Sequence, residues 1–476
     1  MGKNRQIYQV HGLFVGPAPE TGYHFINNSG VLNNDYQNVT SNHNLIQPIL
    51  RVQQVSYNLN AERTEVKQLG KRGVVARPII SFPTINISFD YLQMGLINEA
   101  RMGFYVNYAK YSDSGIGEPF YSDNFSVGLL SGFVTKSLKR ESNDLQWPHA
   151  YRDKRNLFVA VGKEGFDLNK GYYTGQDTDV QNVIGFGNCY LTSYRARATI
   201  GDFPRCSVEY IAENMTVQTS GRGQPVPALN TRTRAPVTGI YYNLPSNFQA
   251  STNNRVLLPG DILIDINSTS AFSGIDVIYG TGTAGTTNSI NDIVDLGVHL
   301  GDAKIQSYEI DLSLPRASLN SIAHKLPLDR PINFPVYANL DFSMVVGDDK
   351  TGSLYNLLHQ DDEYNVAVKL NNPFSAYRRG TAIQYDFRRA KFAGMSFGNA
   401  IGTNKVANFN FSVEVDPSDF KRGLFISGLL NVDGFLNVPL GFLLVSHPSG
   451  AASGDGGYLL QENGDKIITK QFTLLY

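Results

Sequence analysis

The sequence contains one stretch twice, and this repetition constrains the fold more than any other feature. The first copy covers 51–92 and the second, more diverged copy covers 304–344. When Arg77-Pro78 is placed over Arg330-Pro331, further residues align without a gap: Gln53 with Gln306, Leu59 with Leu312, Arg63 with Arg316 and Val66 with Leu319. One deletion then brings Phe82-Pro83 over Phe334-Pro335. Each copy has the same order of alternating strand, Arg-containing loop, Arg-Pro, Phe-Pro and second strand, which indicates an internal repeat.

Two further blocks follow each copy in the same order. The first block is a short helical pattern, formed by Leu96, Ile97, Ala100 and Phe104 in one copy and by Leu354, Leu357 and Leu358 in the other. The second block is a pair of strands around an Ile-Gly turn, at Ile200-Gly201 and at Ile401-Gly402. Both units are far longer than the roughly 20–45 residues of a solenoid repeat. We therefore predict two similar domains in tandem.

The repeat divides the chain into five segments. They are an N-terminal arm at 1–45, a first domain at 46–217 with an insertion at about 112–155, a linker at 218–303, a second domain at 304–416 and a C-terminal extension at 417–476. The linker begins with a Gly-, Pro- and Thr-rich run typical of a mobile segment. The extension is short for a core of its own, so we expect it to pack on the second domain.

Alternating apolar residues predict strands in most of both copies. Val52–Leu59 has the pattern of a half-buried strand, and Ile85–Tyr91 and Tyr194–Ile200 alternate cleanly. Asn156–Gly162 and Ile262–Ile266 are further strand predictions. The many Tyr, Phe and Gly residues agree with a mainly β fold.

Composition limits the classes of function. Charged residues make up only 17% of the chain, and its 26 Tyr and 27 Phe suggest that other chains cover much of its surface. A net charge of −1 excludes a global basic field for holding nucleic acid. The first residues lack the apolar core of a signal peptide, and the longest apolar run, Phe435–Val445, is too short to span a bilayer. Two cysteines, Cys189 and Cys206, cannot build a disulfide framework, and Cys206 is expected opposite about residue 198.

No motif predicts catalysis, a cofactor or a metal. Gly280, Gly282 and Gly285 spell a dinucleotide-binding pattern, but no βαβ unit surrounds them, so we interpret them as a Gly-Thr loop. His359 stands beside three acidic residues after a short helical pattern, which is typical of a solvated helix end. A basic run within the insertion is interpreted as a solvated loop; its members are Lys136, Lys139, Arg140, Arg152, Lys154 and Arg155. We expect a protein without enzymatic activity.

Arginines at matched positions are the candidate functional residues. Arg63 corresponds to Arg316, and Arg77 corresponds to Arg330. Each could fix a loop within its own domain or form an ion pair with another subunit, and arginine suits both roles. The sequence leaves these two alternatives open.

Two runs of the first copy resemble the tail tube proteins of long-tailed bacteriophages. One is VQQVSYNLN followed by Arg63, Thr64 and Glu65 and then by the Arg-Pro and Phe-Pro pairs. The other is YLTSY at 190–194 followed by IGDFP at 200–204. The second copy carries a weaker version, LSLPRASL at 312–319. The similarity covers the two repeats and does not extend to the arm, the linker or the C-terminal extension.

This resemblance implies antiparallel β-sandwich or barrel domains, each with a short helix. Such domains stack in rings around the channel through which the genome leaves. Some tubes of siphophages, whose tails do not contract, contain two domains per chain and form trimeric rings with pseudo-sixfold symmetry. The resemblance also implies as partners the tail terminator, tape measure and distal tail proteins and passing double-stranded DNA, with no membrane or cofactor. It implies synthesis in the host bacterial cytoplasm and a place in the virion.

Two other functions remain open at the level of sequence. The chain could be another virion component, such as a capsid, decoration or baseplate protein. It could also be a carbohydrate-binding or glycan-degrading tail protein, although only one Trp is available to stack on sugars.

Overall fold

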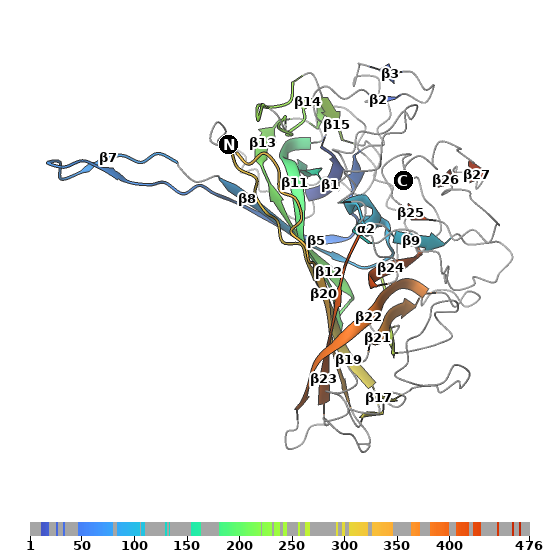
Figure 1. The fold of residues 1–476 in the computed structure, drawn as a ribbon. Coiled ribbons are helices and arrows are strands. Elements are labelled where there is room, and N and C mark those ends of the chain that lie inside the picture. Colours follow the sequence, from blue (N-terminus) through green and yellow to red (C-terminus); the bar gives the residue numbers. More distant parts are fainter. Residues whose placement is uncertain are drawn as a thin grey trace, which may run out of the picture.

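Antiparallel strands dominate the computed structural model of the protein (Figure 1). Apart from a few short pieces, the structure describes residues 11–18, 46–79, 83–104, 106–109, 154–162, 180–219, 221–230, 233–238, 241–244, 262–266, 304–321, 326–345, 363–371, 381–398, 406–417 and 422–429. The predicted mainly β class is confirmed.

The first half contains strands β1 to β15 and, between β8 and β9, helix α2. They are β1 (His11–Pro17), β2 (Phe25–Ile26), β3 (Leu32–Asn33), β4 (Gln47–Pro48), β5 (Val52–Asn60), β6 (Val66–Lys67), β7 (Val74–Ala76), β8 (Thr84–Leu92), α2 (Ile97–Met102), β9 (Val106–Ala109), β10 (Arg155–Gly162), β11 (Val180–Thr199), β12 (Arg205–Ala212), β13 (Asn214–Gln218), β14 (Arg222–Pro225) and β15 (Tyr241–Asn243).

The second half contributes strands alone among the described residues. They are β16 (Ile262–Ile266), β17 (Asp292–Ile293), β18 (Val298–His299), β19 (Lys304–Ser313), β20 (Tyr337–Val345), β21 (Glu363–Asn371), β22 (Thr381–Gly398), β23 (Val406–Glu414), β24 (Gly423–Leu429), β25 (Val445–Ser446), β26 (Leu459–Leu460) and β27 (Lys466–Ile467). The helix predicted around 354–358 and the glycines at 280–285 lie outside the described residues.

One continuous antiparallel run of eight strands crosses the molecule. Its order is β5-β8-β12-β11-β19-β20-β23-β22, and every adjacent pair is antiparallel. The first four strands come from 52–212 and the last four from 304–414. The junction is the pairing of β11 with β19, which runs from Ser193 opposite Ser313 to Thr199 opposite Ser307.

The two groups of four strands have the same registers. Adding 253 to a residue number in β5 or β8 gives the matching position in β19 or β20, so the pair Leu59–Ile85 corresponds to Leu312–Ala338. Adding 201 relates β11 and β12 to β22 and β23 in the same way. Irregularities in pairing recur at matched places, at Val52/Gln54 and Ile305/Ser307. This agreement extends over all four strands.

Long strands carry a second group of strands on their outer halves. β11 also pairs with β10 and β13, while β22 pairs with β21 and β24. One more strand covers each outer edge, since β1 pairs with β10 and β16 pairs with β21. Residues 11–17 of the N-terminal arm are therefore part of the chain's own sheet. Strand β24 of the C-terminal extension contacts both halves, because it pairs with β22 and runs parallel to β9.

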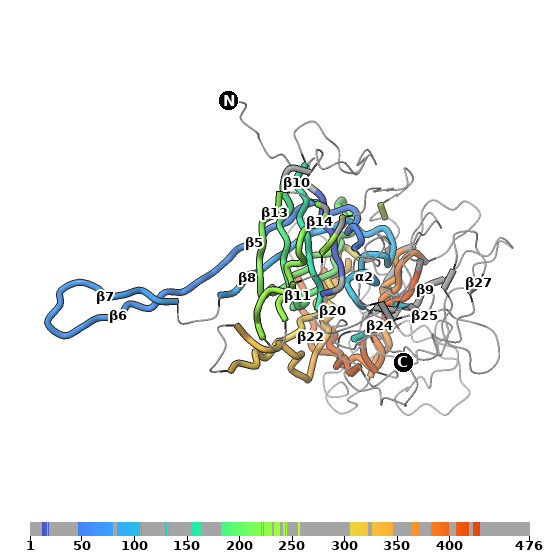
Figure 2. The backbone as a smooth tube through the Cα atoms, turned by 90° about the horizontal axis from the view of Figure 1, so that it is seen from above, coloured from blue at the N-terminus to red at the C-terminus, as the bar shows by residue number. Residues whose placement is uncertain are grey.

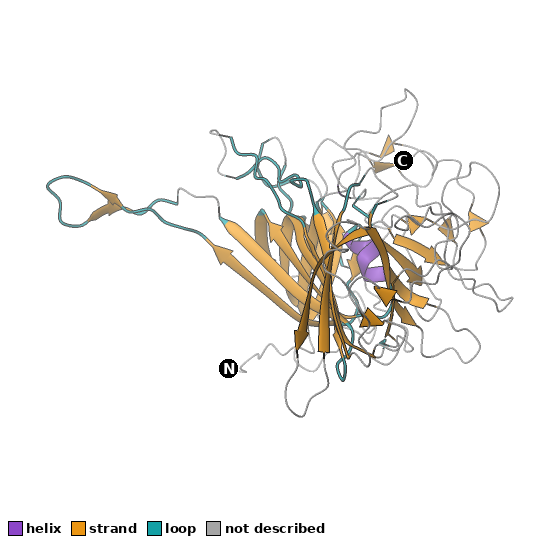
Figure 3. Cartoon of the chain, turned by 60° about the horizontal axis from the view of Figure 1, so that its bottom comes forward, coloured by secondary structure: helices purple, strands orange, loops and turns teal. Residues whose placement is uncertain are grey.

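The apolar faces of both halves form one core. It includes Ile87 and Phe89 of β8 and Ile310 of β19, and Leu96 and Ala100 at helix α2 pack into the same cluster. Figure 3 shows the helix enclosed among the strands. Because one core connects both halves, the strands cannot be separated without exposing it to water.

Two expectations from the sequence are wrong. The start of the linker is packed rather than mobile, because Val226, Ala228 and Val237 are buried with residues of β1 and β10 in a second core cluster. The basic run of the insertion is not entirely a solvated loop, because Lys154 and Arg155 are 6% and 5% exposed. The other members of that run lie outside the described residues. Neither sequence segment has the alternation that signals burial.

Two smaller observations complete the comparison. Cys206 lies opposite Ala196 rather than residue 198, and both cysteines are buried free thiols. No helix in the described ranges combines the length and the apolar character needed to cross a bilayer.

Candidate assembly interface

Within the described part of the chain, both ends of the eight-strand run present an open edge. Among the described strands, β5 pairs along its length with β8 alone. At the other end, the last part of β22, Phe392–Gly398, pairs with β23 on one side. On its other side, the pairing with β21 ends at Lys391; β24 lies on the same side as β23 and pairs with β22 no farther than Arg388. An unpaired strand edge has free N–H and C=O groups and is a template for another strand.

The protein contains an internal example of the pairing that these edges lack. In the first half, Ser193–Arg197 of β11, which match Gly394–Gly398, pair with β19. β19 is in turn the strand that matches β5. The free edge of β22 and the free edge of β5 therefore correspond to two edges that bind each other inside the chain.

Side-chain exposure identifies the same edges. Tyr57 and Leu59 of β5 are 44% and 55% exposed, although they belong to the apolar face and lie opposite Ile87 and Ile85. Their counterparts in β19, Ile310 and Leu312, are 0% exposed because β11 covers them.

At the other open edge the contrast recurs. Phe397 is 46% exposed, whereas its counterpart Ala196 is 0% exposed. The prediction of a half-buried strand at 52–59 therefore fails in the isolated chain, since that strand lacks the neighbour that its counterpart has.

The four arginines predicted from the sequence all lie in two matched loops, which we call the first arm (61–83) and the second arm (314–335). Arg63 Nη1 donates to the carbonyl of Arg77 at 3.1 Å, and Arg316 Nη1 donates to the carbonyl of Arg330 at 3.0 Å. Arg77 Nη2 donates to Glu65 Oε1 at 2.7 Å, and Arg330 Nη1 donates to Ser318 Oγ at 3.1 Å. Within the chain, these contacts fix each loop at matched atoms.

The arms differ in their surroundings. The first arm projects away from the body as an extended hairpin that contains β6 and β7 (Figures 1 and 2). The second arm lies against the first half, where Arg316 Nε donates to the carbonyl of Leu191 at 2.9 Å. Burial lowers the pKa of Arg330, whose side chain is enclosed there, while the nearby carboxylate of Glu213 opposes this shift.

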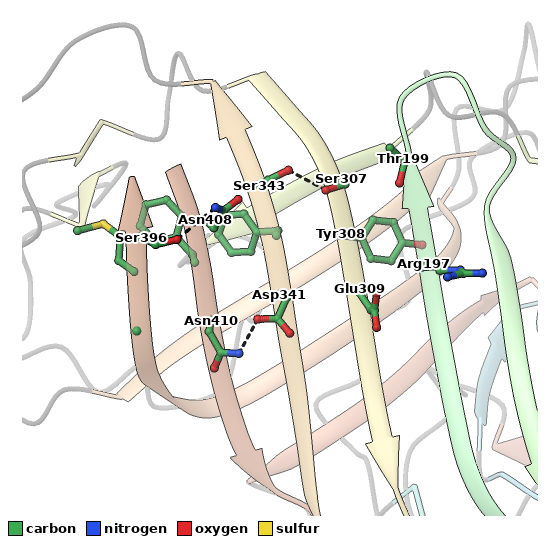
Figure 4. A pocket seen from close by; sticks show the side chains of 14 residues that line it. Arg197, Thr199, Ser307, Tyr308, Glu309, Asp341, Ser343, Ser396, Asn408 and Asn410 are labelled. Atoms are coloured by element: carbon green, nitrogen blue, oxygen red, sulfur yellow. Dashed lines mark hydrogen bonds between the residues drawn. The ribbon is translucent and has the colours of Figure 1, made fainter. Parts of the chain in front are cut away.

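The face of the sheet opposite the core is polar. A shallow depression over β11, β19, β20, β23 and β22 is lined mainly by small polar and charged side chains (Figure 4). Hydrogen bonds join Ser307 to Ser343 at 2.7 Å and Asn408 to Ser396 at 3.2 Å, and Asn410 donates to Asp341. Neighbouring strands on this face thus hold one another's polar groups.

The positive and negative charges on this face compensate each other across the junction between the halves. Arg195 Nε lies 3.1 Å from Glu309 Oε1 and 3.4 Å from Asp311 Oδ1. These side chains are partly exposed, so each pair contributes little to stability. Their arrangement prevents a strongly charged face along the junction.

A polar cluster is buried behind the junction. Glu99 of α2 is 0% exposed, and its Oε1 accepts hydrogen bonds from Tyr91 at 2.7 Å and Tyr194 at 3.1 Å. Tyr194 in turn contacts Tyr385 of β22, with their oxygens 2.9 Å apart. Burial raises the pKa of Glu99, although the hydrogen bonds that it accepts oppose this shift. The cluster connects the helix to strands of both halves.

Sequence reasoning missed the residues of the open edges. Tyr57, Leu59 and Phe397 look like ordinary core residues of alternating strands. Their significance comes from exposure, which depends on which strand lies beside them. The internal repeat was the available signal, because it aligns Leu59 with Leu312.

Within the described residues, no three His, Cys, Asp or Glu side chains are grouped as a metal site. Glu363, the last of the three acidic residues beside His359, has its carboxylate 3.0 Å from Arg422 Nη2 and 3.8 Å from Arg389 Nε.

Comparisons with known proteins give distant similarities to solved structures. No protein-family model and no curated protein sequence matches the chain. Two solved structures are similar over 46% of this chain. One is the anti-feeding prophage cap, described as a tube-terminating cap, with a TM-score of 0.22, 9% identity and 95% of its own chain covered. The other is the sixfold-symmetrised anti-feeding prophage baseplate, with a TM-score of 0.22, 8% identity and 97% of that chain covered. With TM-scores this low, neither neighbour defines the fold or the function of this chain.

Proposed function

We propose that this protein is a structural subunit of a bacteriophage tail tube, which polymerises through its sheet edges and catalyses no reaction. The observation that carries this proposal is the internal pairing of β11 with β19, together with open edges on β22 and β5 at the matched positions. The resemblance of both repeats to tail tube proteins supports the same function.

The matched registers specify how two protomers would pair. Because β11 corresponds to β22 and β19 to β5, Ser396 of one protomer lies opposite Asn58 of the next, as Arg195 lies opposite Asp311. Phe397 then lies opposite Tyr57 of the next protomer. Pairing would cover both exposed side chains and would give the two strand edges a hydrogen-bonding neighbour.

Such an interface is head to tail, because it joins two different edges of the same molecule. Head-to-tail contacts produce a closed ring when the rotation per subunit divides the circle. Each chain contributes two similar groups of four strands, β5-β8-β12-β11 and β19-β20-β23-β22. The pairing of β11 with β19 joins these two groups within the chain. Three protomers would therefore give a ring of six such groups around a continuous barrel.

In this arrangement the polar face of the sheet lines the channel, and the core side with α2 faces outward. Double-stranded DNA must slide through such a channel without being held, and each fixed phosphate contact adds to the affinity. The charge compensation by Glu309 and Asp311 around Arg195 suits this requirement. Stacked rings would meet the tail terminator, tape measure and distal tail proteins as partners in the virion.

Negative-stain electron microscopy of the purified protein tests the proposal. We expect rings or hollow tubes of uniform diameter, and we expect compact single particles from a Phe397→Asp variant, because an aspartate at the paired edge would be desolvated without a partner. Compact monomers from the native protein at high concentration would contradict the proposal.

A further inference from the structure

We propose that the first arm docks on the neighbouring protomer across the β22–β5 interface, on the segment Lys391–Ala393, with the guanidinium of Arg63 bonded to the carbonyl of Phe392. This inference rests on the proposed assembly and adds a second contact surface to it. Its occupant is another copy of this chain.

The second arm supplies the template for this contact. It leaves β19 and lies on the strand that pairs with β19, where the N–H of Leu314 donates to the carbonyl of Thr192 at 2.8 Å. Arg316 Nε donates to the carbonyl of Leu191, and its guanidinium lies over the Tyr190 ring, 5.4 Å from the centroid. Strand pairing thus continues directly into the arm.

Side chains farther along the second arm complete the contact. Asp329 accepts a hydrogen bond from the hydroxyl of Tyr190 at 3.1 Å and lies 3.8 Å from Lys154 Nζ. Arg234 donates to the carbonyl of Leu328 at 3.5 Å. The second arm is therefore held by the bend of β11 and by residues beside it.

The first arm has the same internal framework. Thr64 N donates to the carbonyl of Pro78 at 3.0 Å, as Ala317 N donates to that of Pro331 at 3.1 Å. Arg63 and Arg316 also form matched bridges, to Ile79 and Ile332. The structural difference is that the first arm follows β5, beside whose open edge no further strand lies in the described part of the chain.

The matched numbering gives the receiving residues. Thr192 and Leu191 correspond to Ala393 and Phe392, so Ala61 N would donate to the carbonyl of Ala393, and Arg63 Nε to that of Phe392. Both carbonyls belong to the backbone, so their use does not depend on conserved side chains.

The side chains at the proposed contact differ from those of the template in charge. Lys391 stands where the first half has Tyr190, and Glu62 stands where the second arm has Pro315. The contact of Arg316 with the Tyr190 ring would not be reproduced, because Arg63 and Lys391 are both cations, and the carboxylate of Glu62 next to Arg63 would compensate their charge.

Site-specific photo-cross-linking tests this docking. p-Benzoylphenylalanine is placed at position 76, since Ala76 matches Asp329, and the assembled protein is irradiated after a light and a heavy isotope-labelled preparation have been mixed. We expect mixed-isotope dimers whose cross-linked peptides contain Lys391 or Glu363, the counterparts of Tyr190 and Lys154. The control carries the same group at position 217, where Val217 is 64% exposed on β13, and should give no cross-link to these peptides.

The outcomes separate this inference from the proposed function. Rings whose position-76 cross-links map elsewhere on the neighbour, or to another ring, would overturn the docking and leave the tube assembly standing. Cross-links within a single chain would overturn it as well. A preparation without rings would instead contradict the proposed function.

Discussion

Asn188 and Arg389 adopt the same strained backbone conformation at matched positions of the two halves, with φ values of 52° and 55°. Each residue stands where a long strand changes its pairing partner. In each case a buried asparagine side chain accepts a hydrogen bond from the backbone N–H of that residue. Asn156 Oδ1 accepts from Asn188 N at 3.2 Å, and Asn365 Oδ1 accepts from Arg389 N at 3.0 Å. Positive φ is uncommon for residues other than glycine, especially for arginine. One inherited building block explains such an agreement between halves that differ in side chains.

The first prediction concerns these two asparagines. Replacing Asn156 or Asn365 by Ala removes the acceptor of a strained N–H, which should destabilise the fold by about 1–3 kcal/mol in each case. Urea unfolding of the Phe397→Asp variant, chosen to keep the chain monomeric, measures the effect. If only one of the two substitutions destabilised the protein, the two bends would not be equivalent.

The second prediction concerns the buried carboxyl of Glu99. Its pKa is raised by burial, so the folded protein retains a proton that the unfolded chain releases once the pH exceeds the ordinary carboxyl pKa. The contribution of Glu99 to stability is therefore fully present in acid and declines as the pH rises toward the folded pKa.

A Glu99→Gln variant has no such loss. Between pH 4 and pH 7 the free energy of unfolding of the parent should therefore fall relative to that of the variant. The difference between the two should change by at most about 1.4 kcal/mol per pH unit. Parallel urea titrations of the two proteins provide the comparison. A difference that does not change with pH would show that Glu99 is ionised in the folded state or titrates alike in both states.

The third prediction concerns a buried ion pair near the second arm. Arg234 Nη2 lies 2.6 Å from Glu213 Oε2, and the two side chains are 3% and 0% exposed. Arg234→Met leaves a buried carboxylate without its cation and should cost roughly 3–5 kcal/mol.

The double variant Arg234→Met with Glu213→Gln removes both charges and keeps one acceptor oxygen for Asn188, while the amide NH2 group can donate to the hydroxyl of Tyr190; both residues donate to Glu213 in the parent. It should recover most of the loss in thermal or urea unfolding. A double variant as unstable as the single one would mean that packing, and not charge, sets the cost.

The fourth prediction concerns the open edges. Tyr57→Asp and Phe397→Asp should each block assembly, because each places a charge in a contact that excludes water. Val217→Asp, at a side chain that is 64% exposed on β13, is the matched control and should assemble normally. Sedimentation velocity distinguishes the outcomes, and circular dichroism verifies that all three variants keep their β structure. Assembly by both edge variants would place the interface elsewhere.

Part of this organisation could be predicted from the sequence, because it depends on local patterns. Alternation in Ile85–Tyr91 predicts a strand with one buried face, and the matched Arg-Pro pairs predict two similar arms. The relation of the halves could not be predicted, since periodicity does not reveal which strand pairs with which. That β11 binds β19, and that Tyr57 is thereby left uncovered while Ile310 is not, depends on tertiary pairing.

The burial of charged residues also could not be predicted from the sequence. Lys154, Arg155 and Glu99 look like surface residues, since charged side chains are almost never fully buried unless they are paired. Their partners lie far away in the chain, as the hydrogen bond from Tyr194 to Glu99 illustrates. Contacts between residues so far apart in the chain cannot be predicted from the local sequence.

Disulfide trapping of the paired edges tests the central claim most directly. Asn58→Cys and Ser396→Cys in one chain should form a bond between protomers on oxidation of the assembled protein, and covalent trimers should be the largest closed product on a non-reducing gel. The control pairs Ser396→Cys with Asn86→Cys, because Asn86 lies one strand farther away on β8, and it should not cross-link. Monomers from the first pair, or equal cross-linking by both pairs, would contradict assembly through these edges in this register.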